Sequence, residues 1–194
     1  MKKILSALLI GLFATVVSAG EVSDFIKGTA EKVQVGIDKS KNLKEFNDYM
    51  NSTIVPDDII DFEKLSQATL GFHWRKLTDQ QKAEFTKEYK DFLYRFYVKS
   101  MFKFKNSQIE YRREITTGMS GKIKTEVYFK EDGESRNALI EYVLIKTPKG
   151  WRISDVIIEG ITLSLSYKDV FIKIANEKGV ATLIEELKSK NAIK

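Results

Sequence analysis

The hydrophobic pattern of this chain changes period twice, from helical to alternating and back to helical. Over residues 21–54 apolar side chains recur at the spacing of one helix face, and a break at residues 40–42 divides this stretch into a predicted pair of helices. A proline ends the second helix, and Asp57 or Asp58 is expected to cap a short helix that runs through Leu65. The chain after residue 20 is therefore predicted to begin with a helical segment.

The strongest helix signal begins at Thr78. Thr78 and Gln81 have the capping-box spacing, in which each side chain bonds the backbone N–H of the other residue. The helix is predicted to run from Asp79 to about Phe102. One of its faces is expected to be unusually aromatic, because these residues recur at helical spacing: Phe85, Tyr89, Phe92, Leu93 and Phe96.

Beyond residue 107 the pattern alternates with period two, which predicts strands. Turn sequences at residues 131–133 and 148–150 divide residues 122–158 into three strands of an antiparallel meander. The middle strand is apolar on both faces, so the pattern does not decide which face points towards the core. Its two alternating sets are Ala138, Ile140, Tyr142 and Leu144 on one face, and Leu139, Val143 and Ile145 on the other.

After Gly160 the pattern is helical again, with a break at Gly179 and a last helix over residues 180–187. Helices, then strands, then helices predict an α+β fold in which a small antiparallel β-sheet packs against a helical layer. The chain contains no internal repeat and no linker rich in Ser or Gly, which favours one continuous domain.

Residues 1–19 have the three parts of a cleavable secretory signal peptide: Lys2 and Lys3, an apolar run over residues 4–17, and small residues before a cleavage point after Ala19. A membrane-spanning helix needs roughly 20 apolar residues, which is more than this run supplies. No Cys follows the run, so a lipoprotein signal is excluded. We therefore expect export of a single domain, residues 20–194, without an anchor.

Charge and composition limit the classes of partner. The chain has 32 Lys and Arg against 27 Asp and Glu, and removal of Lys2 and Lys3 lowers its formal net charge from +5 to +3. That excess is too small to indicate nucleic-acid binding, although it would assist loose contact with anionic membrane surfaces. With no Cys, the exported chain must be stabilised by a packed core rather than by disulfides.

The sequence contains few side chains of the types that form catalytic or metal-binding sites. Zinc and copper sites use His or Cys, and the chain has only His73 and no Cys, so no metal and no other cofactor is predicted. The sequence at residues 118–121, Gly-Met-Ser-Gly, lacks the spacing of a serine nucleophile motif and falls in a predicted hairpin turn. Three carboxylates on strands or at their ends, Glu141, Asp155 and Glu159, keep an acid–base enzyme open as an alternative.

Four motifs occur in order over most of the chain after residue 20. They are Leu70-Gly71-x-x-Trp74-Arg75, Thr78-x-x-Gln81-x-x-x-Phe85, Trp151-x-x-x-Asp155-x-x-x-Glu159-Gly160-Ile161-Thr162-Leu163, and Tyr-Lys-Asp-Val-Phe at residues 167–171. In their order and spacing, and in the leader that precedes them, the chain resembles the MlaC family of periplasmic phospholipid-binding proteins, also called the toluene-tolerance family. Each motif alone is weak, and the set together is fairly specific.

The resemblance implies a deep apolar pocket between the sheet and the helical layer, where phospholipid acyl chains are held. It also implies a periplasmic carrier, a monomer without catalytic residues, that moves lipid between the outer and inner membranes and maintains the lipid asymmetry of the outer membrane. The implied partners are an inner-membrane ABC transporter with an MCE-type subunit and an outer-membrane lipoprotein complex.

Two sets of residues are expected to form the site. The pocket set is Leu70, Trp74, Phe85, Phe92, Leu93, Phe96, Val127, Phe129, Ile140, Tyr142, Leu144, Ile153, Val156 and Ile158; the headgroup candidates are Arg75, Arg152 and Lys168. Two other classes of function stay open: a small exported enzyme that acts on lipid or cell-wall material through carboxylates, and an interaction module whose core is filled and holds no ligand.

Overall fold

The computed structural model describes residues 20–54, 56–131 and 133–192, and the predicted signal peptide lies outside these ranges. The helices are α1 (Glu21–Lys39), α2 (Leu43–Thr53), α3 (Phe62–Leu70), α4 (Asp79–Met101), α5 (Leu163–Lys178) and α6 (Val180–Ala192), with short 3₁₀ turns η1 (Pro56–Asp58), η2 (Gly71–Lys76) and η3 (Phe102–Phe104). The strands are β1 (Gln108–Thr117), β2 (Ser120–Glu131), β3 (Glu134–Thr147), β4 (Gly150–Ile158) and β5 (Ile161–Thr162). This order confirms the predicted α+β class.

The strands form an antiparallel meander in the order β1-β2-β3-β4-β5. The sequence at residues 118–121 does form a hairpin turn, in which Thr117 pairs with Ser120 and Gly118 takes a φ of 58°. A positive φ strains most side chains but not glycine, which explains the residue at this position. The sequence pattern did not predict β1 as a separate strand.

The register identifies the inward face of β3, which the sequence left open. Ile140 pairs with Thr125 on one side and Ile158 on the other, and Tyr142 lies on the same face two residues later. Leu139 points to the other face and is 49 % exposed. The set that begins with Ala138 and Ile140 therefore faces the helices, and we call this side of the sheet its inner face.

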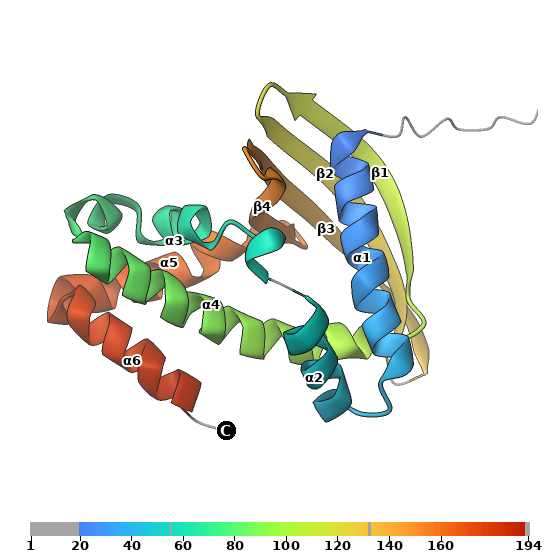
Figure 1. The fold of residues 1–194 in the computed structure, drawn as a ribbon, viewed down its shortest axis with the longest axis horizontal. Coiled ribbons are helices and arrows are strands. Elements are labelled where there is room, and N and C mark those ends of the chain that lie inside the picture. The colour runs from blue at the N-terminus through green and yellow to red at the C-terminus, as the bar shows by residue number, and fades with distance from the viewer. Residues whose placement is uncertain (1–19, 55, 132, 193–194) are drawn as a thin grey trace, which may run out of the picture.

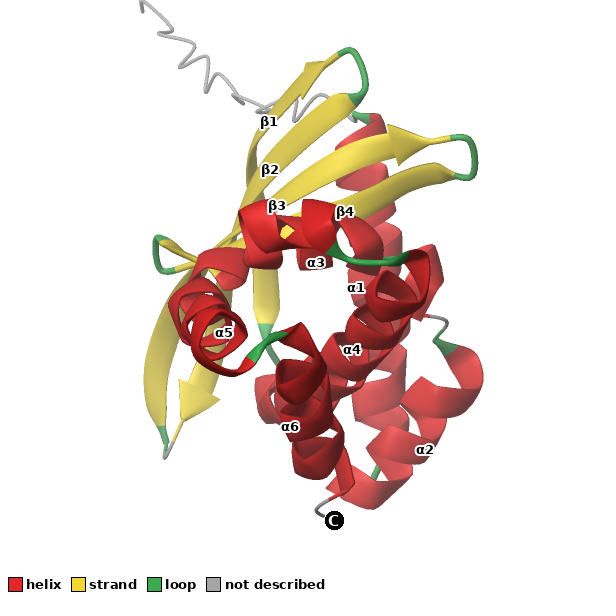
Figure 2. Cartoon of the chain, turned by 90° about the vertical axis from the view of Figure 1, so that its left-hand side faces the viewer, coloured by secondary structure: helices red, strands yellow, loops and turns green. Residues whose placement is uncertain are grey.

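The helices gather on the inner face of the sheet (Figures 1 and 2). Helix α1 lies along β1 and β2, where Val22 and Ile26 pack against Ile123 and Leu144. Helices α3, α4, α5 and α6 form a second cluster with its own buried core. Val156 packs against both clusters, so β4 lies where the two groups of helices meet.

The long helix α4 confirms the strongest prediction from the sequence. The Thr78 hydroxyl accepts from the Gln81 backbone N–H at 3.2 Å, and the Gln81 side chain accepts from the Thr78 N–H at 3.1 Å. The helix ends at Met101, one residue before the expected end. None of the helices in the described ranges is long and apolar enough to cross a membrane.

The prediction for the short helix after Pro56 was wrong in its cap and its bounds. Residues 56–58 form a 3₁₀ turn, and α3 begins at Phe62 with Asp61 as its cap, which accepts from the Lys64 N–H at 2.8 Å. The delay has a physical cause, because the backbone at Ile59 and Asp61 is bonded to Ile153 of β4 at 2.8 Å on each side. A segment extended along a strand cannot be helical at the same time.

Candidate functional site

The inner face of the sheet is closed at one end and partly exposed at the other. Under α1, Ile123 and Leu144 have no exposed surface. Towards the β2–β3 hairpin and the end of β4, Ile140, Val156 and Ile158 keep an intermediate exposure although they point towards the helices. A well-packed core would bury such side chains fully, so this end of the sheet carries apolar area that the described residues leave incompletely covered.

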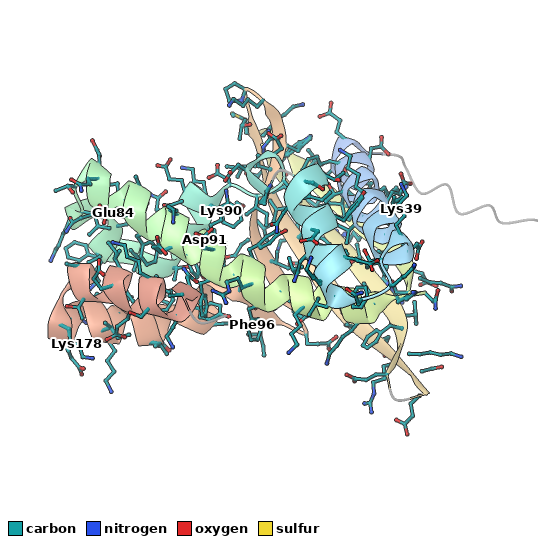
Figure 3. All side chains as sticks on the ribbon, turned by 60° about the horizontal axis from the view of Figure 1, so that its bottom comes forward. Lys39, Glu84, Lys90, Asp91, Phe96 and Lys178 are labelled. Atoms are coloured by element: carbon teal, nitrogen blue, oxygen red, sulfur yellow. The ribbon has the colours of Figure 1, made fainter. Side chains whose placement is uncertain are left out.

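Aromatic side chains of α4 and α5 border this exposed end. Phe92 meets the ring of Tyr167 edge-on with centroids 5.4 Å apart, and both pack against the same helical cluster as Val156. Phe96, one turn further along α4, is 58 % exposed and projects from the side of α4 opposite Lys90 (Figure 3). We define the open apolar surface by six residues: Phe92, Phe96, Ile140, Val156, Ile158 and Tyr167.

The structure divides the predicted pocket set into three places. Leu70, Trp74, Phe85 and Leu93 lie in the helical core, where α5 and α6 cover them, and Leu144 and Ile153 lie in the cluster under α1. Tyr142 and Val156 also pack against the cluster under α1. The remaining members lie on α4 or on the inner face of the sheet: Phe92, Phe96, Val127, Phe129, Ile140, Tyr142, Val156 and Ile158. Of these, Val127 is only 5 % exposed, and Phe129 meets Phe104 edge-on at 4.9 Å.

Two hollows in the described part of the chain lie away from this surface. One, of about 300 Å³, lies between α1, the end of α2 and η1 and includes Asp24, Lys32 and Asp58. The other, of about 620 Å³, lies beside the first half of α4 and is lined mainly by charged residues, together with Trp74 of the predicted pocket set. Their charged linings do not suit acyl chains, which need a dry apolar wall.

The three headgroup candidates have different surroundings. Arg152 uses four of its five N–H donors within the protein, bonding the carbonyls of Asp57, Lys149 and Trp151 and the carboxylate of Asp58. It therefore joins η1 to β4. Arg75 is exposed on η2, and Lys168 of α5 is half-buried close to Gly71 at the start of η2. Arg75 and Lys168 thus both lie where η2 meets α5.

The carboxylates that left an enzyme open are each engaged in separate contacts. Asp155 accepts from the Val156 N–H at 2.9 Å, from the Ser164 N–H at 3.2 Å and from the Ser164 hydroxyl at 2.5 Å. Thr162, the N-cap residue of α5, makes no side-chain bond to the helix, so Asp155 caps α5 from a neighbouring strand. Glu159 accepts from the Leu139 N–H at 2.5 Å and thereby ties β3 to the turn after β4.

Glu141 lies outside this region, on the outer face of the sheet. The ammonium groups of Lys122 and Lys124, at 2.6 and 3.2 Å, hold the pKa of the Glu141 carboxyl below its usual range, against the opposing effect of partial burial. An ionised carboxylate between two lysines is arranged for an ion pair rather than for proton transfer. The bonds of these three carboxylates favour structural roles.

A cluster of tyrosines borders the open apolar surface and was not predicted as part of a site. Tyr89 is fully buried and its hydroxyl accepts from Thr69 at 3.3 Å; burial raises its pKa. Tyr97 and Tyr167 are only half-buried. Burial raises the pKa of Tyr97. One signal in the sequence could have pointed to these residues: tyrosines, which carry a polar hydroxyl, occur within otherwise apolar helix faces.

Comparison with known proteins supports the resemblance stated from the motifs. The family described as MlaC protein matches residues 25–189. The chain is 21 % identical over 192 residues to the intermembrane phospholipid transport system binding protein MlaC of Haemophilus influenzae, a match that covers 95 % of this chain and 89 % of that protein. A solved structure of a phospholipid-binding protein from Ralstonia solanacearum, in complex with a phospholipid, superposes with a TM-score of 0.73 at 24 % identity, covering 87 % of this chain and 96 % of the other. The match to this solved structure shows the same fold.

Proposed function

The chain belongs to the MlaC family, and we propose that it is a periplasmic phospholipid-binding carrier that holds acyl chains between its sheet and its helices. The Haemophilus influenzae relative is named as the binding protein of an intermembrane phospholipid transport system, and the Ralstonia solanacearum structure contains a phospholipid. A carrier of this kind binds and releases its cargo and needs no catalytic residue, cofactor or metal. Its single lipid-binding domain spans residues 20–194, and residues 1–19 direct its export.

The open apolar surface is the observation that carries this proposal. A buried methylene contributes about 0.8 kcal/mol, so two acyl chains with about thirty methylenes cost on the order of 20 kcal/mol to hold in water. A carrier must offset that cost with apolar wall, and Ile140, Val156 and Ile158 supply such wall on the inner face of the sheet. Phe92 and Phe96 supply it from α4. The surface is incompletely covered because the acyl chains complete it.

The affinity of such a carrier must be comparable to that of a bilayer, since tighter binding would prevent delivery. We propose that the chain works as a monomer between an outer-membrane lipoprotein complex and an inner-membrane ABC transporter with an MCE-type subunit, and so maintains outer-membrane lipid asymmetry. Arg75 and Lys168 are the proposed headgroup contacts, because their donors lie near the exposed side of η2 and α5. Arg152 is left out of this set because most of its donors are used within the protein.

Two adjacent residues of β3 provide the test with a matched control. Ile140→Asn puts a polar amide on the inner face, where it removes apolar wall, and Leu139→Asn makes the same kind of change one residue away on the outer face. We expect wild-type protein and Leu139→Asn to retain phospholipid through purification, and Ile140→Asn to lose most of it. Bound lipid is measured by native mass spectrometry and by extraction, with thermal unfolding as the check of folding.

Two outcomes would contradict the carrier function. Wild-type protein that is purified without phospholipid and takes none up from vesicles would exclude it. Equal lipid content in folded Ile140→Asn and Leu139→Asn would remove the inner face of the sheet from the binding site.

A further inference from the structure

Two large apolar side chains are exposed where α5 meets η2. Phe72 of η2 is 65 % exposed, and Leu165 in the first turn of α5 is 54 % exposed. The two elements are in contact, and a Cβ added at Gly71 would lie 3.8 Å from the side chain of Lys168. Leu165 precedes Lys168 by three residues, so both lie on the same side of α5. Phe72, which follows Gly71, and Leu165 are therefore both neighbours of one cationic side chain.

Three cations accompany these apolar side chains. The ammonium group of Lys76 lies 4.3 Å from the centre of the Phe72 ring. Arg75 is exposed beside it, and η2 contains no acidic residue. Among the described residues no ion pair involves Arg75, Lys76 or Lys168, whereas Arg152 is joined to η1. Uncommitted cations beside exposed apolar groups complement a surface that is anionic outside and apolar inside.

The apolar part of this region continues to the open apolar surface through Ile161. Ile161 is exposed, and it pairs with Ile158 of the open apolar surface in the β4–β5 ladder. The carboxylate of Glu159, in the turn between them, is held on the Leu139 N–H at 2.5 Å. We define the α5–η2 face by six residues: Phe72, Arg75, Lys76, Ile161, Leu165 and Lys168.

We propose that the α5–η2 face docks on the surface of an anionic bilayer, with its three apolar side chains among the lipid headgroups and its three cations on the phosphates. The inference rests on the proposed carrier function and adds to it the place where the carrier meets a membrane. Acyl chains that passed through water on their way to the protein would expose their whole apolar area. The pairing of Ile158 with Ile161 makes the docked face continuous with the apolar wall and so shortens that passage.

The make-up of the α5–η2 face favours a bilayer over a protein partner. A specific protein interface takes roughly 20 to 30 residues from each side, which is far more than this face supplies. A bilayer needs only a few inserted apolar side chains, with lysine and arginine heads that reach the phosphates from flexible stems. Asp169, an exposed acid on α5, lies about 100° round the helix from Lys168 and so points away from this contact. Binding of this kind is weak and reversible, as delivery requires.

Vesicle flotation tests the docking directly. Protein purified with its bound phospholipid is mixed with vesicles of phosphatidylethanolamine and phosphatidylglycerol, or with vesicles of phosphatidylcholine alone. We expect the wild type to bind the anionic vesicles more tightly than the neutral ones, and more weakly when NaCl is raised from about 0.05 M to about 0.5 M. The double variant Phe72→Ser, Leu165→Ser should bind about tenfold more weakly because two apolar side chains are lost. Lys76→Gln should bind about fivefold more weakly because one cation is lost.

Val170→Ser is the matched control, because Val170 is 57 % exposed on the same helix. It follows Leu165 by five residues and therefore lies about 140° round α5 from it. This variant should bind vesicles as the wild type does. All of these variants should also retain the wild-type amount of phospholipid by native mass spectrometry, since none changes the open apolar surface. Thermal unfolding checks that each variant is folded.

Three outcomes would overturn the docking face while the carrier function stands. One is equal vesicle binding by the double variant and Val170→Ser. Another is a wild type that keeps its phospholipid but binds no protein-free vesicle, which would leave the face to a protein partner. The third is loss of bound phospholipid from the folded double variant, which would place Phe72 and Leu165 in the lipid site instead. Wild-type protein that is purified without phospholipid and takes none up would overturn the carrier function itself.

Discussion

Replacing Asp155 by alanine should destabilise the whole fold, because this carboxylate joins β4 to the start of α5. It accepts three hydrogen bonds, from the Val156 N–H, the Ser164 N–H and the Ser164 hydroxyl, at 2.9, 3.2 and 2.5 Å. Ser164 is 3 % exposed, so its N–H and hydroxyl cannot turn to bulk water when the carboxylate is removed. The first turn of α5 would be left with unsatisfied donors and without its compensating negative charge.

The expected loss can be worked out from these contacts. Loss of an N-cap costs about 1 kcal/mol, and unsatisfied buried donors add about 1–3 kcal/mol. A total of about 3 kcal/mol corresponds to a fall in Tm of roughly 6–12 °C for a domain of this size. Asp155→Asn keeps one acceptor oxygen and should lose about half as much.

The assay is thermal unfolding followed by circular dichroism. Asp169→Ala removes an exposed carboxylate from the same helix and should change the free energy of unfolding by no more than about 0.5 kcal/mol. If Asp155→Ala unfolded within about 2 °C of the wild type, the capping role would be refuted. Unchanged stability together with loss of a lipid-hydrolysing turnover would instead favour the carboxylate enzyme.

Two further predictions concern the attachment of α1 to the sheet. Gly121→Ala would place a Cβ 2.6 Å from Val22 and 3.2 Å from Trp151. It should lower the free energy of unfolding by about 1–3 kcal/mol, as measured by urea denaturation. If the Gly121→Ala variant were as stable as the wild type, α1 would be able to move aside. Burial raises the pKa of Glu114, but bonds from the Ser23 hydroxyl and N–H outweigh it and hold that pKa below its usual value. The contribution of Glu114 to stability is therefore present above the unfolded pKa of about 4.3 and is lost as pH falls through the lower folded pKa. Glu114→Gln should make the loss of stability at acid pH less steep. An unchanged loss of stability at acid pH would contradict this.

Local signals in the sequence predicted those parts of the fold that local interactions determine. The start of α4 follows from bonds between Thr78 and Gln81, three residues apart, and the β1–β2 turn follows from the conformational freedom of Gly118. The break between α1 and α2 was also placed correctly at residues 40–42. In each case the residues that decide the structure are neighbours in the chain.

The rest depended on contacts between residues far apart in the sequence. Asp61 rather than Asp57 or Asp58 caps α3 because Ile153, more than ninety residues later, keeps the preceding backbone extended. In the same way, helical spacing placed Phe85 and Phe96 on one aromatic face but did not show that α5 and α6 would cover the first half of it. Phe85 therefore has no exposed surface and Phe96 keeps 58 %.

The short pairings along β4 have a consequence for the behaviour of the protein in concentrated solution. One end of the free side of β4 is bonded to the segment at Ile59 and Asp61, and the other end to β5. At the opposite side of the sheet, the register shift between Tyr111 and Glu114 interrupts the outer strand. Both borders are thus poor templates for strand addition by another chain, which protects a protein with an uncovered apolar surface from polymerising edge to edge.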